Sequence, residues 1–370
     1  MSLTNLLATP AISLAIVLII MPYIRKIAIK TNLVDKPDQR KKHSGQVPLT
    51  GGLAIYFAMM ATLLVTSPSW EGLSEIRILL IAAGILLITG WIDDKTELRA
   101  SVKFTIQIML AYYAFLNGIR IESFFGILGI HQIPVILQYA ITLVVITGVV
   151  NAFNLMDGID GLAAGLALVS FALFGWLAFL TGQTMLLFLF LALAGGLAGF
   201  MRFNFSRDKK VFMGDAGSLF IGFIMVASAI MLLQSAQGTA NVKLVLSVIV
   251  GILALPVLDS LRVYRRRAKE GFSPLRADRT HFHHLVLHLG IQSQHAALFT
   301  ISVSILMIGL GVAIGTLTSI TLMILSIFTA FIIISSLLSL NNKVTTWKEL
   351  VNEMEHKQNV AKSPALQNNS

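Results

Sequence analysis

Residues 160–201 read DGLAAGLALVSFALFGWLAFLTGQTMLLFLFLALAGGLAGFM, and after Asp160 they contain no charged side chain. The polar cluster TGQT at 181–184 divides the stretch into two apolar segments. Each segment is close to the roughly 20 residues that an α-helix needs to cross a bilayer. The stretch therefore predicts two transmembrane helices, near 160–180 and 183–201, joined by a short turn.

The same apolar pattern extends over most of the chain. Of its 370 residues, 56% are hydrophobic and 12% charged, and the mean hydropathy is +0.80. An ordinary soluble domain has a charged share of roughly a quarter, so the composition predicts an all-α, polytopic membrane protein with about eleven transmembrane helices. The predicted spans, of which the third and fourth are short, lie near residues 5–25, 48–66, 77–92, 103–118, 134–153, 160–180, 183–201, 216–235, 242–261, 296–315 and 319–340.

The positions of Lys and Arg predict how these spans are oriented. No charge precedes the first span, and Arg25, Lys26 and Lys30 follow it, which is the reverse of a secretory signal peptide. If the N-terminus lies outside, 25 of the 28 Lys and Arg residues fall in the inner loops and the tail. The positive-inside rule therefore favours an N-terminus outside and a cytoplasmic C-terminus.

Composition also limits the domain organisation and the partners. We expect one integral-membrane domain over residues 1–340 and a polar cytoplasmic tail over 341–370, with a short helix followed by disorder. The net charge of +10 does not indicate nucleic-acid binding, because the basic residues lie beside predicted spans and there is no soluble basic domain. Attraction to the anionic headgroups of the lipid bilayer explains the charge better. The absence of cysteine excludes disulfides and thiolate metal sites.

Five stretches between spans carry polar motifs, and counting alternate loops places all of them on one membrane face. A transporter is expected to bury its polar residues near the middle of the bilayer instead. Clustering at one interface indicates an enzyme that acts on a lipid headgroup. The five stretches are 34–52, 93–103, 151–162, 202–218 and 262–288.

The second stretch begins with Asp93 and Asp94, two adjacent carboxylates at the point where a span ends. One member of a close carboxylate pair often has a raised pKa, which suits a general base, and such a pair can also orient a cation. A solvated loop is the alternative. Lys103, at the start of the next span, is placed to face the same site.

The third stretch, NAFNLMDGIDGLAAG, repeats polar residues at a spacing of three: Asn151, Asn154 and Asp157, with Asp160 extending the series. On a helix this spacing stacks side chains along one face. Oxygen ligands of this kind suit a hard cation such as Mg²⁺. Hydrogen bonding between helices is the alternative interpretation.

The fourth stretch places Asp215 between glycines at the start of a span, in KKVFMGDAGSLF. Gly214 and Gly217 would let the backbone approach a ligand closely, and the helix start would offer N–H groups to an anion. Phe212 fits either the protein core or a stacking platform for a base, and the residues alone leave both alternatives open.

The fifth stretch contains four histidines after seven cations. His281, His284 and His288 share one helix face, and His283 lies beside them. Zinc is one interpretation, but the segment has no HExxH pattern and no cysteine. A phosphate site at a helix start, with Arg279 and the imidazoles as donors, is favoured.

Six motifs, in order from residue 34 to about 288, resemble those of the polyprenyl-phosphate N-acetylhexosamine-1-phosphate transferases. They are VDKP..RK.H.G..PL.GG, the DD pair, NAFN.MDGIDGL, KVFMGDAGS, YRR...G.SP and DR.H.HH. The resemblance implies a glycosyl-1-phosphate transferase of the bacterial plasma membrane, with its active site facing the cytoplasm. Such an enzyme uses Mg²⁺ or Mn²⁺, joins undecaprenyl phosphate to the sugar-1-phosphate of a UDP-sugar and releases UMP. A homodimer is compatible with the family.

Two local differences favour the N-acetylglucosamine branch of that family. This chain has PLTGG and HFHH, where the branch that transfers phospho-MurNAc-pentapeptide carries PTMGG and three consecutive histidines. The expected product is undecaprenyl-diphospho-N-acetylglucosamine, the first lipid-linked intermediate of a cell-surface polysaccharide. The alternatives are another UDP-N-acetylhexosamine donor, the MurNAc-pentapeptide donor, an anion transporter or a zinc-dependent hydrolase.

The resemblance also implies roles for individual residues. In the family pattern Asp93 deprotonates the acceptor, Lys103 holds the diphosphate and Phe212 stacks on uracil. The usual third aspartate of DDxxD is Glu97 here, which leaves the role of that position open. The implied site comprises catalytic Asp93, Asp94, Lys103 and Asp157, substrate-binding Asp160, Phe212, Arg279, His281, His283 and His284, and metal-binding Asn154 and Asp215.

Overall fold

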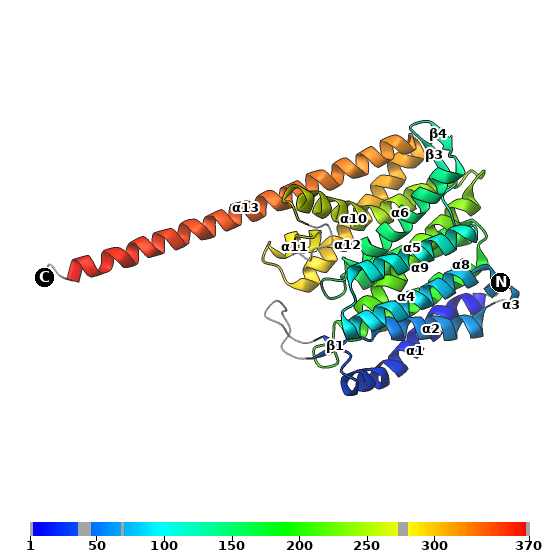
Figure 1. Ribbon diagram of the computed structural model, residues 1–370, viewed down its shortest axis with the longest axis horizontal. Helices are drawn as coiled ribbons and strands as arrows, with labels where there is room; N and C mark the ends of the chain where they lie inside the picture. The colour runs from blue at the N-terminus through cyan, green and yellow to red at the C-terminus, as the bar shows by residue number, and fades with distance from the viewer. Residues whose placement is uncertain (1–2, 36–45, 68–69, 273–279, 368–370) are drawn as a thin grey trace.

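The computed structural model describes residues 3–35, 46–67, 70–272 and 280–367. Most of these residues form helices that run side by side in one array, with a long helical extension at one end (Figure 1). The helices are α1 (Leu3–Lys30), α2 (Gly51–Thr66), α3 (Trp70–Glu75), α4 (Arg77–Thr96), α5 (Ala100–Leu116), α6 (Val135–Asn154), α7 (Leu162–Leu180), α8 (Thr184–Asn204), α9 (Gly214–Ala236), α10 (Val242–Lys269), α11 (Phe282–Leu287), α12 (Ser293–Leu317) and α13 (Ile320–Gln367).

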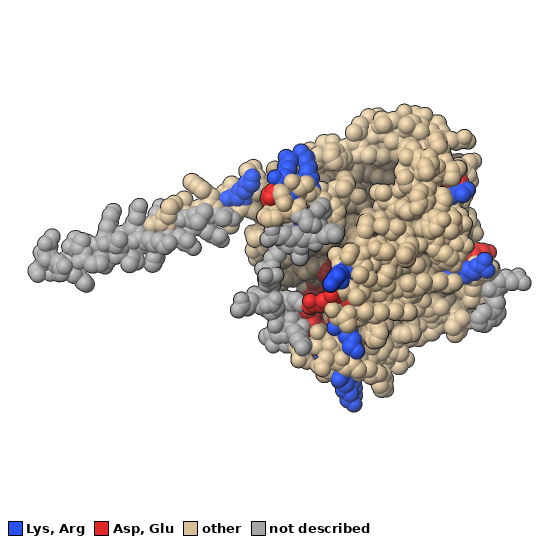
Figure 2. Space-filling view, in the orientation of Figure 1, with Lys and Arg blue, Asp and Glu red and all other residues tan. Residues whose placement is uncertain are grey.

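Among the described residues, eight helices are long and apolar enough to cross a membrane, namely α1, α6 to α10, α12 and α13. The three other predicted spans are also helical, but α2 and α5 are shorter and α4 ends in charged residues. The side of the array seen in Figure 2 is almost free of charged side chains, which gather at its two ends. The polytopic, mainly helical fold is therefore confirmed, and the count of eleven spans stays a prediction.

The two termini lie at opposite ends of the array (Figure 1). This arrangement agrees with an odd number of crossings, whereas the side on which each terminus lies remains a prediction. The sequence predicted a short helix and then disorder after residue 340, but α13 continues as one helix to Gln367. Its polar part is rich in Lys, Glu and Gln, which favour helix even without a buried face.

Helix α9 forms the centre of the array and packs against α2, α4, α6, α7 and α10. It is apolar on all sides, as expected for a helix enclosed by others. A Cβ atom at Gly52 would lie 2.2 Å from the backbone nitrogen of Gly217, and one at Gly90 would lie 2.4 Å from that of Ala216. Gly217 therefore serves the contact between α9 and α2, and the sequence analysis was wrong to assign it to ligand approach.

Two small antiparallel sheets depart from the all-α prediction. β1 (Val34–Asp35) pairs with β2 (Val47–Pro48), and β3 (Ser123–Ile127) pairs with β4 (Ile130–Gln132).

The chain after β2 is also bound to the segment that precedes α9. The N–H group of Phe212 donates to Pro48 O at 2.9 Å, and the N–H group of Gly51 donates to Phe212 O at 2.9 Å. These bonds fix the segment before α9 beside the start of α2.

Candidate active site

A cavity of about 980 Å³ lies at the end of the array where β1 and α11 are found. Figure 2 shows acidic side chains gathered beside a hollow at this end. Among the residues that line the cavity, seven are acidic and two are lysines. The acidic residues are Asp35, Asp93, Asp94, Glu97, Asp157, Asp160 and Asp215, and the lysines are Lys103 and Lys210.

Nine of the twelve predicted site residues line this cavity, although they come from four separate stretches of the chain. They are Asp93, Asp94, Lys103, Asn154, Asp157, Asp160, Phe212, Asp215 and His284. His281 and His283 are described but do not line the cavity. Arg279 falls outside the described residues.

Lys103 joins two carboxylates across the cavity. Its Nζ atom lies 2.6 Å from Asp93 Oδ2 and 3.0 Å from Asp215 Oδ2. The other oxygen of Asp93 accepts the N–H group of Leu98 at 2.7 Å. Burial, reinforced by Asp215 and opposed by Lys103, raises the pKa of Asp93 to about 6. Asp93 is therefore ionised at neutral pH but close to its titration range, which suits a general base.

Asp94 lines the cavity and binds the start of α9. Its carboxylate accepts the backbone N–H groups of Asp215 at 2.9 Å and Ala216 at 3.2 Å. Gly214 has φ +74, and a Cβ atom there would lie 2.5 Å from Asp94 Oδ2. The sequence analysis offered these N–H groups to an external anion, and that interpretation is wrong because Asp94 already occupies them.

Asp94 follows the predicted span 77–92, and burial together with electrostatic repulsion favours its protonated form. Burial, with the charge of Asp215 next in size, raises the pKa of Asp94 to about 8. An opposing effect comes from the two backbone N–H groups at the start of α9, which favour the ionised form. Asp94 thus positions Asp215 and holds a proton readily in the absence of a cation.

The four residues of the predicted Asn and Asp series do not share one helix, because α6 ends at Asn154. The amide nitrogen of Asn154 donates to Asp215 Oδ1 at 3.1 Å and to Ser218 Oγ at 2.8 Å. Asn151 instead donates to Gln107 Oε1 on α5 and does not line the cavity. Hydrogen bonding between helices therefore describes Asn151, whereas Asn154 lies in the cavity wall.

Beyond α6, Asp157 borders the cavity and is exposed to it. Desolvation by the neighbouring cavity wall, with the charge of Asp215 next, raises the pKa of Asp157 to about 7. Asp160 forms an ion pair with Lys210 at 2.5 Å. The Nζ atom of Lys210 also lies 5.2 Å from the ring centroid of Phe212. Phe212 is half-buried and lines the cavity.

The chemistry of the wall fits a divalent cation. The cavity has a surplus of carboxylates over lysines. Desolvation first, and the negative charge of Asp215 next, raise the pKa of Asp94 and that of Asp157. A hard cation that brings phosphates as additional ligands needs only one or two protein carboxylates. Among the described residues no group of three His, Cys, Asp or Glu is arranged to hold a metal by itself. The donor set therefore suits a hard divalent cation that completes its coordination with ligands from outside the protein.

The first histidine of the fifth stretch, His281, is bonded to α10 rather than exposed in the cavity. His281 Nδ1 is 2.9 Å from Oδ2 of Asp259, a residue on α10 that the sequence analysis missed. The available signal was an isolated carboxylate inside the predicted span 242–261, which is costly unless it has a partner. His281 is 4% exposed and is therefore held behind the cavity rather than in it.

His283 is also buried, at 1% exposure, against the backbone of Gly158. Neither of its ring nitrogens has a hydrogen-bond partner among the described residues. Burial, and next the charge of His284, lowers the pKa of His283 to about 3, so the imidazole is neutral. Of the predicted histidines, only His284 and His288 reach the cavity wall.

Comparison with known proteins agrees with this site and fold. Residues 76–233 match the family model described as glycosyl transferase family 4. The chain is 34% identical over 292 residues to an undecaprenyl-phosphate alpha-N-acetylglucosaminyl 1-phosphate transferase of Yersinia pestis, covering 77% of this chain and 78% of that protein.

Two further relatives have similar sequence identity and coverage. The protein of the same name from Escherichia coli strain K12 is 33% identical over 295 residues, covering 78% of each chain. A probable undecaprenyl-phosphate N-acetylglucosaminyl 1-phosphate transferase of Bacillus subtilis is 32% identical over 295 residues, also covering 78% of each. The resemblance inferred from the six motifs is thus confirmed, and the chain belongs to glycosyl transferase family 4.

Proposed function

We propose that this protein transfers N-acetylglucosamine-1-phosphate from UDP-N-acetylglucosamine to undecaprenyl phosphate. The products are undecaprenyl-diphospho-N-acetylglucosamine and UMP. The names of the relatives support the acceptor, undecaprenyl phosphate, and the transferred group, N-acetylglucosamine-1-phosphate. The observation that carries the proposal is the position of Lys103, a cation held between Asp93 and Asp215 in the cavity wall.

The reaction requires two anions to approach each other. An oxygen of the lipid phosphate forms a bond to the sugar-side phosphorus of the donor, and the bond from that phosphorus to the UMP oxygen breaks. Positioning and charge stabilisation dominate the barrier of such a transfer. Lys103 is placed to neutralise one phosphate, and its ammonium also holds Asp93 in the wall.

Asp215 and Asn154 would hold the divalent cation, with the donor diphosphate completing its ligands. When bound, Mg²⁺ or Mn²⁺ supplies positive charge that offsets the negative charge of the diphosphate. Asp94 contributes indirectly, because its carboxylate fixes the backbone of Asp215 and Ala216. Asp157 adds a further carboxylate to the same part of the wall.

Asp93 would take the proton from the lipid phosphate. With a pKa of about 6 it is ionised at neutral pH, and its carboxylate faces the cavity next to Lys103. General-base catalysis of this kind contributes roughly 10²- to 10⁴-fold to a rate. The uridine end of the donor would lie by Phe212, whose ring can stack on a base, with Asp160 and Lys210 beside it.

The location follows from the substrates and from the charge distribution. The cavity opens at the array end that carries α11 and the helical extension, which the positive-inside rule places in the cytoplasm. Cytoplasmic UDP-sugar and membrane-bound acceptor would then meet at the inner face of the bacterial plasma membrane. A homodimer, which the resemblance allows, stays a prediction.

The test uses purified full-length protein with radiolabelled UDP-N-acetylglucosamine, undecaprenyl phosphate and Mg²⁺. We expect label in the lipid fraction and an equal amount of UMP. Parallel reactions with UDP-N-acetylgalactosamine and UDP-MurNAc-pentapeptide measure donor choice. Release of UMP without a lipid product would indicate a hydrolase, and uptake of intact donor into proteoliposomes without UMP would indicate a transporter. Either result would overturn the proposal.

A further inference from the structure

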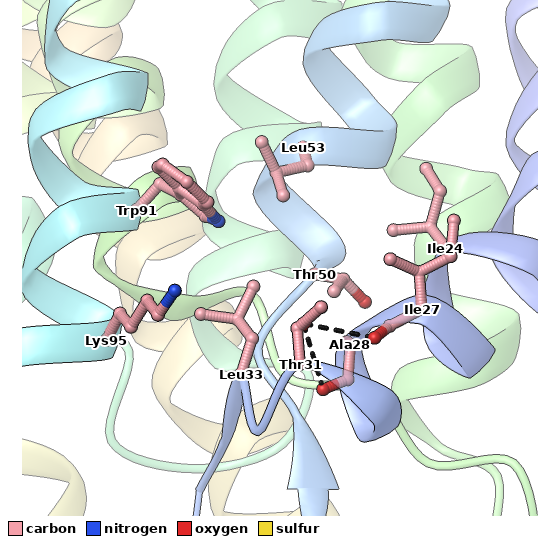
Figure 3. A pocket seen from close by; sticks show the side chains of 9 residues that line it. All are labelled: Ile24, Ile27, Ala28, Thr31, Leu33, Thr50, Leu53, Trp91 and Lys95. Carbon is pink, nitrogen blue, oxygen red and sulfur yellow. Dashed lines mark hydrogen bonds between the residues drawn. The ribbon is translucent and has the colours of Figure 1, made fainter.

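A second cavity, of about 330 Å³, lies at the same end of the array between the ends of α1, α2 and α4 (Figure 3). Most of its lining is aliphatic or aromatic, and three polar side chains interrupt that lining. The lining residues are Ile24, Ile27, Ala28, Thr31, Leu33, Thr50, Leu53, Trp91 and Lys95. None of them is among the residues assigned to the proposed reaction.

Two of the three polar groups form no hydrogen bond or ion pair within the described part of the chain. Thr31 is satisfied, because its hydroxyl donates to Ile27 O at 3.0 Å. Thr50 is 1% exposed, and its hydroxyl has no hydrogen-bond partner among the described residues. Lys95 forms no ion pair within the described part of the chain, and its Nζ atom lies 6.0 Å from the ring centroid of Trp91. A buried hydroxyl without a partner is destabilising, so a ligand that accepts its hydrogen bond would be favoured here.

This pocket is separated from the active-site cavity by backbone. Leu49 and Asp94 line the active-site cavity, whereas the residues that follow them, Thr50 and Lys95, line this one. The two cavities therefore lie back to back across the segment before α2 and the end of α4. A phosphate bound at Lys95 would be on the other side of this wall from Lys103 and could not be the reacting group.

The surroundings of the pocket indicate the class of ligand. Ile27 is 59% exposed and Trp91 is 38% exposed, so apolar side chains reach the outer surface at its mouth. Tryptophan is typical of the level where a membrane protein meets lipid headgroups. Lys26 and Lys30, at the end of α1, add exposed positive charge nearby. A ligand that matches these features has an apolar chain and an anionic head.

We propose that this pocket binds an anionic glycerophospholipid of the bilayer, with its phosphate at Lys95 and part of one acyl chain against Ile24, Ile27 and Leu53. The volume is at the lower end of the range for ligand pockets, which suits a chain segment rather than a whole lipid. The hydroxyl of Thr50 would donate to an ester or phosphate oxygen of this lipid. The inference depends on the membrane-embedded fold and not on the proposed reaction.

The position of the pocket gives such a lipid a structural role. It would fill the junction of α1, α2 and α4, and the last two helices hold the start of α9 through the close contacts of Gly52 and Gly90. A lipid here would stabilise that junction. We therefore expect anionic phospholipid to raise the thermal stability of the detergent-solubilised protein.

Photo-cross-linking tests the location. Full-length protein in nanodiscs is irradiated with phosphatidylglycerol that carries a diazirine on one acyl chain, and the labelled peptides are identified by mass spectrometry. We expect labels on 24–33 and on the peptide that contains Leu53. Labels confined to other helices would overturn the proposal. Displacement of the probe by undecaprenyl phosphate at an equal concentration would assign the pocket to the acceptor and would also overturn it.

Titration of the detergent-solubilised protein with phosphatidylglycerol tests whether Lys95 binds the lipid phosphate. Removing one cation near an anionic lipid costs about 1 kcal/mol, so Lys95→Gln should weaken phosphatidylglycerol binding about fivefold, as measured by thermal shift. Lys30→Gln is the matched control, because it removes an exposed neighbouring cation that does not line the pocket. Solvent screens this cation more strongly, so its loss should weaken binding less than the loss of Lys95. Equal effects of the two substitutions, or equal binding of phosphatidylcholine, would overturn the proposal.

Thr50→Val provides a variant of nearly equal shape without the hydroxyl. If the hydroxyl serves the lipid, this variant should be more stable than the native protein without lipid and should gain less from phosphatidylglycerol. An unchanged gain from phosphatidylglycerol would contradict the assigned role of Thr50.

Discussion

The Nδ1 atom of His281 lies 2.9 Å from Oδ2 of Asp259, a carboxylate with no exposed surface. The other oxygen of Asp259 accepts the N–H group of Phe282 at 3.0 Å and a guanidinium N–H group of Arg262 at 2.7 Å. One carboxylate on α10 therefore fixes the start of α11, and through it the position of His284 in the cavity wall. Asp259 is a positioning residue.

Replacing Asp259 should destabilise the protein strongly. Removing one partner of a buried ion pair typically costs about 3–5 kcal/mol because the remaining charge stays buried. Asp259→Ala should therefore lower the thermal unfolding midpoint and the turnover together. Glu270→Gln is the control, since the exposed pair of Glu270 with Arg266 is worth only about 0–1 kcal/mol. Equal unfolding midpoints for the two variants would contradict the buried role of Asp259.

A methyl group at Gly90 should disturb the active site from a distance. A Cβ atom there would lie 2.4 Å from backbone atoms of Asp215 and Ala216, so α4 and α9 would have to separate. Such overpacking costs about 1–3 kcal/mol, and we expect Gly90→Ala to lower both stability and turnover. Gly309→Ala is the matched control on α12, where a Cβ atom meets nothing within 4 Å. It should be neutral or slightly stabilising, and similar losses in both variants would refute the packing argument.

Substitution of Phe212 separates stacking from packing. Phe212→Leu keeps apolar bulk in the cavity wall but removes the ring face that lies under Lys210. Steady-state kinetics should therefore show a higher KM for the donor, by about three- to tenfold, with a smaller change in kcat. An unchanged donor KM combined with a lower unfolding midpoint would identify Phe212 as a core residue.

Asp215 should be essential for turnover. Asp215→Asn removes the charge that faces Lys103 and Asn154, and an amide cannot neutralise a cation. We expect activity to fall at least about 10²-fold at any Mg²⁺ concentration, on the scale of losing one preorganised charged group. Glu97→Gln removes an acid from the rim of the same cavity and should retain most activity. Near-normal turnover of Asp215→Asn would remove this residue from the metal site.

The raised pKa values of Asp94 and Asp157 predict proton release when the cation binds. Their values of about 8 and 7 exceed the ordinary value of 3.8 for aspartate. Without a cation, the folded state then binds more protons than the unfolded chain between about pH 4 and 8, so these groups lower stability as pH rises through that window. A divalent cation displaces the protons. Calorimetry in two buffers should detect more release at about pH 6.5 than at about pH 9, and Asp157→Asn should reduce it.

The amino-acid sequence by itself determined the class of protein and the end of the molecule at which its chemistry lies. Hydrophobic length is a local property, so the long apolar helices could be found without tertiary information. Successive connections between spans alternate between the two ends of a bundle, and this alternation placed Asp93, Asn154 and Asp215 together. The structure brings all three to one cavity.

Only the tertiary structure decided which partner each polar side chain takes. The carboxylate of Asp94 binds backbone 121 positions away in the sequence, and Asn151 turns to Gln107 on another helix. His281 and His283 share a motif with His284, yet they are buried beside Asp259 and Gly158. Spacing along the chain fixes the face on which a side chain lies. Which neighbour the side chain meets on that face depends on how the helices pack. Close backbone contacts, such as that of Gly52 with Gly217, determine this packing.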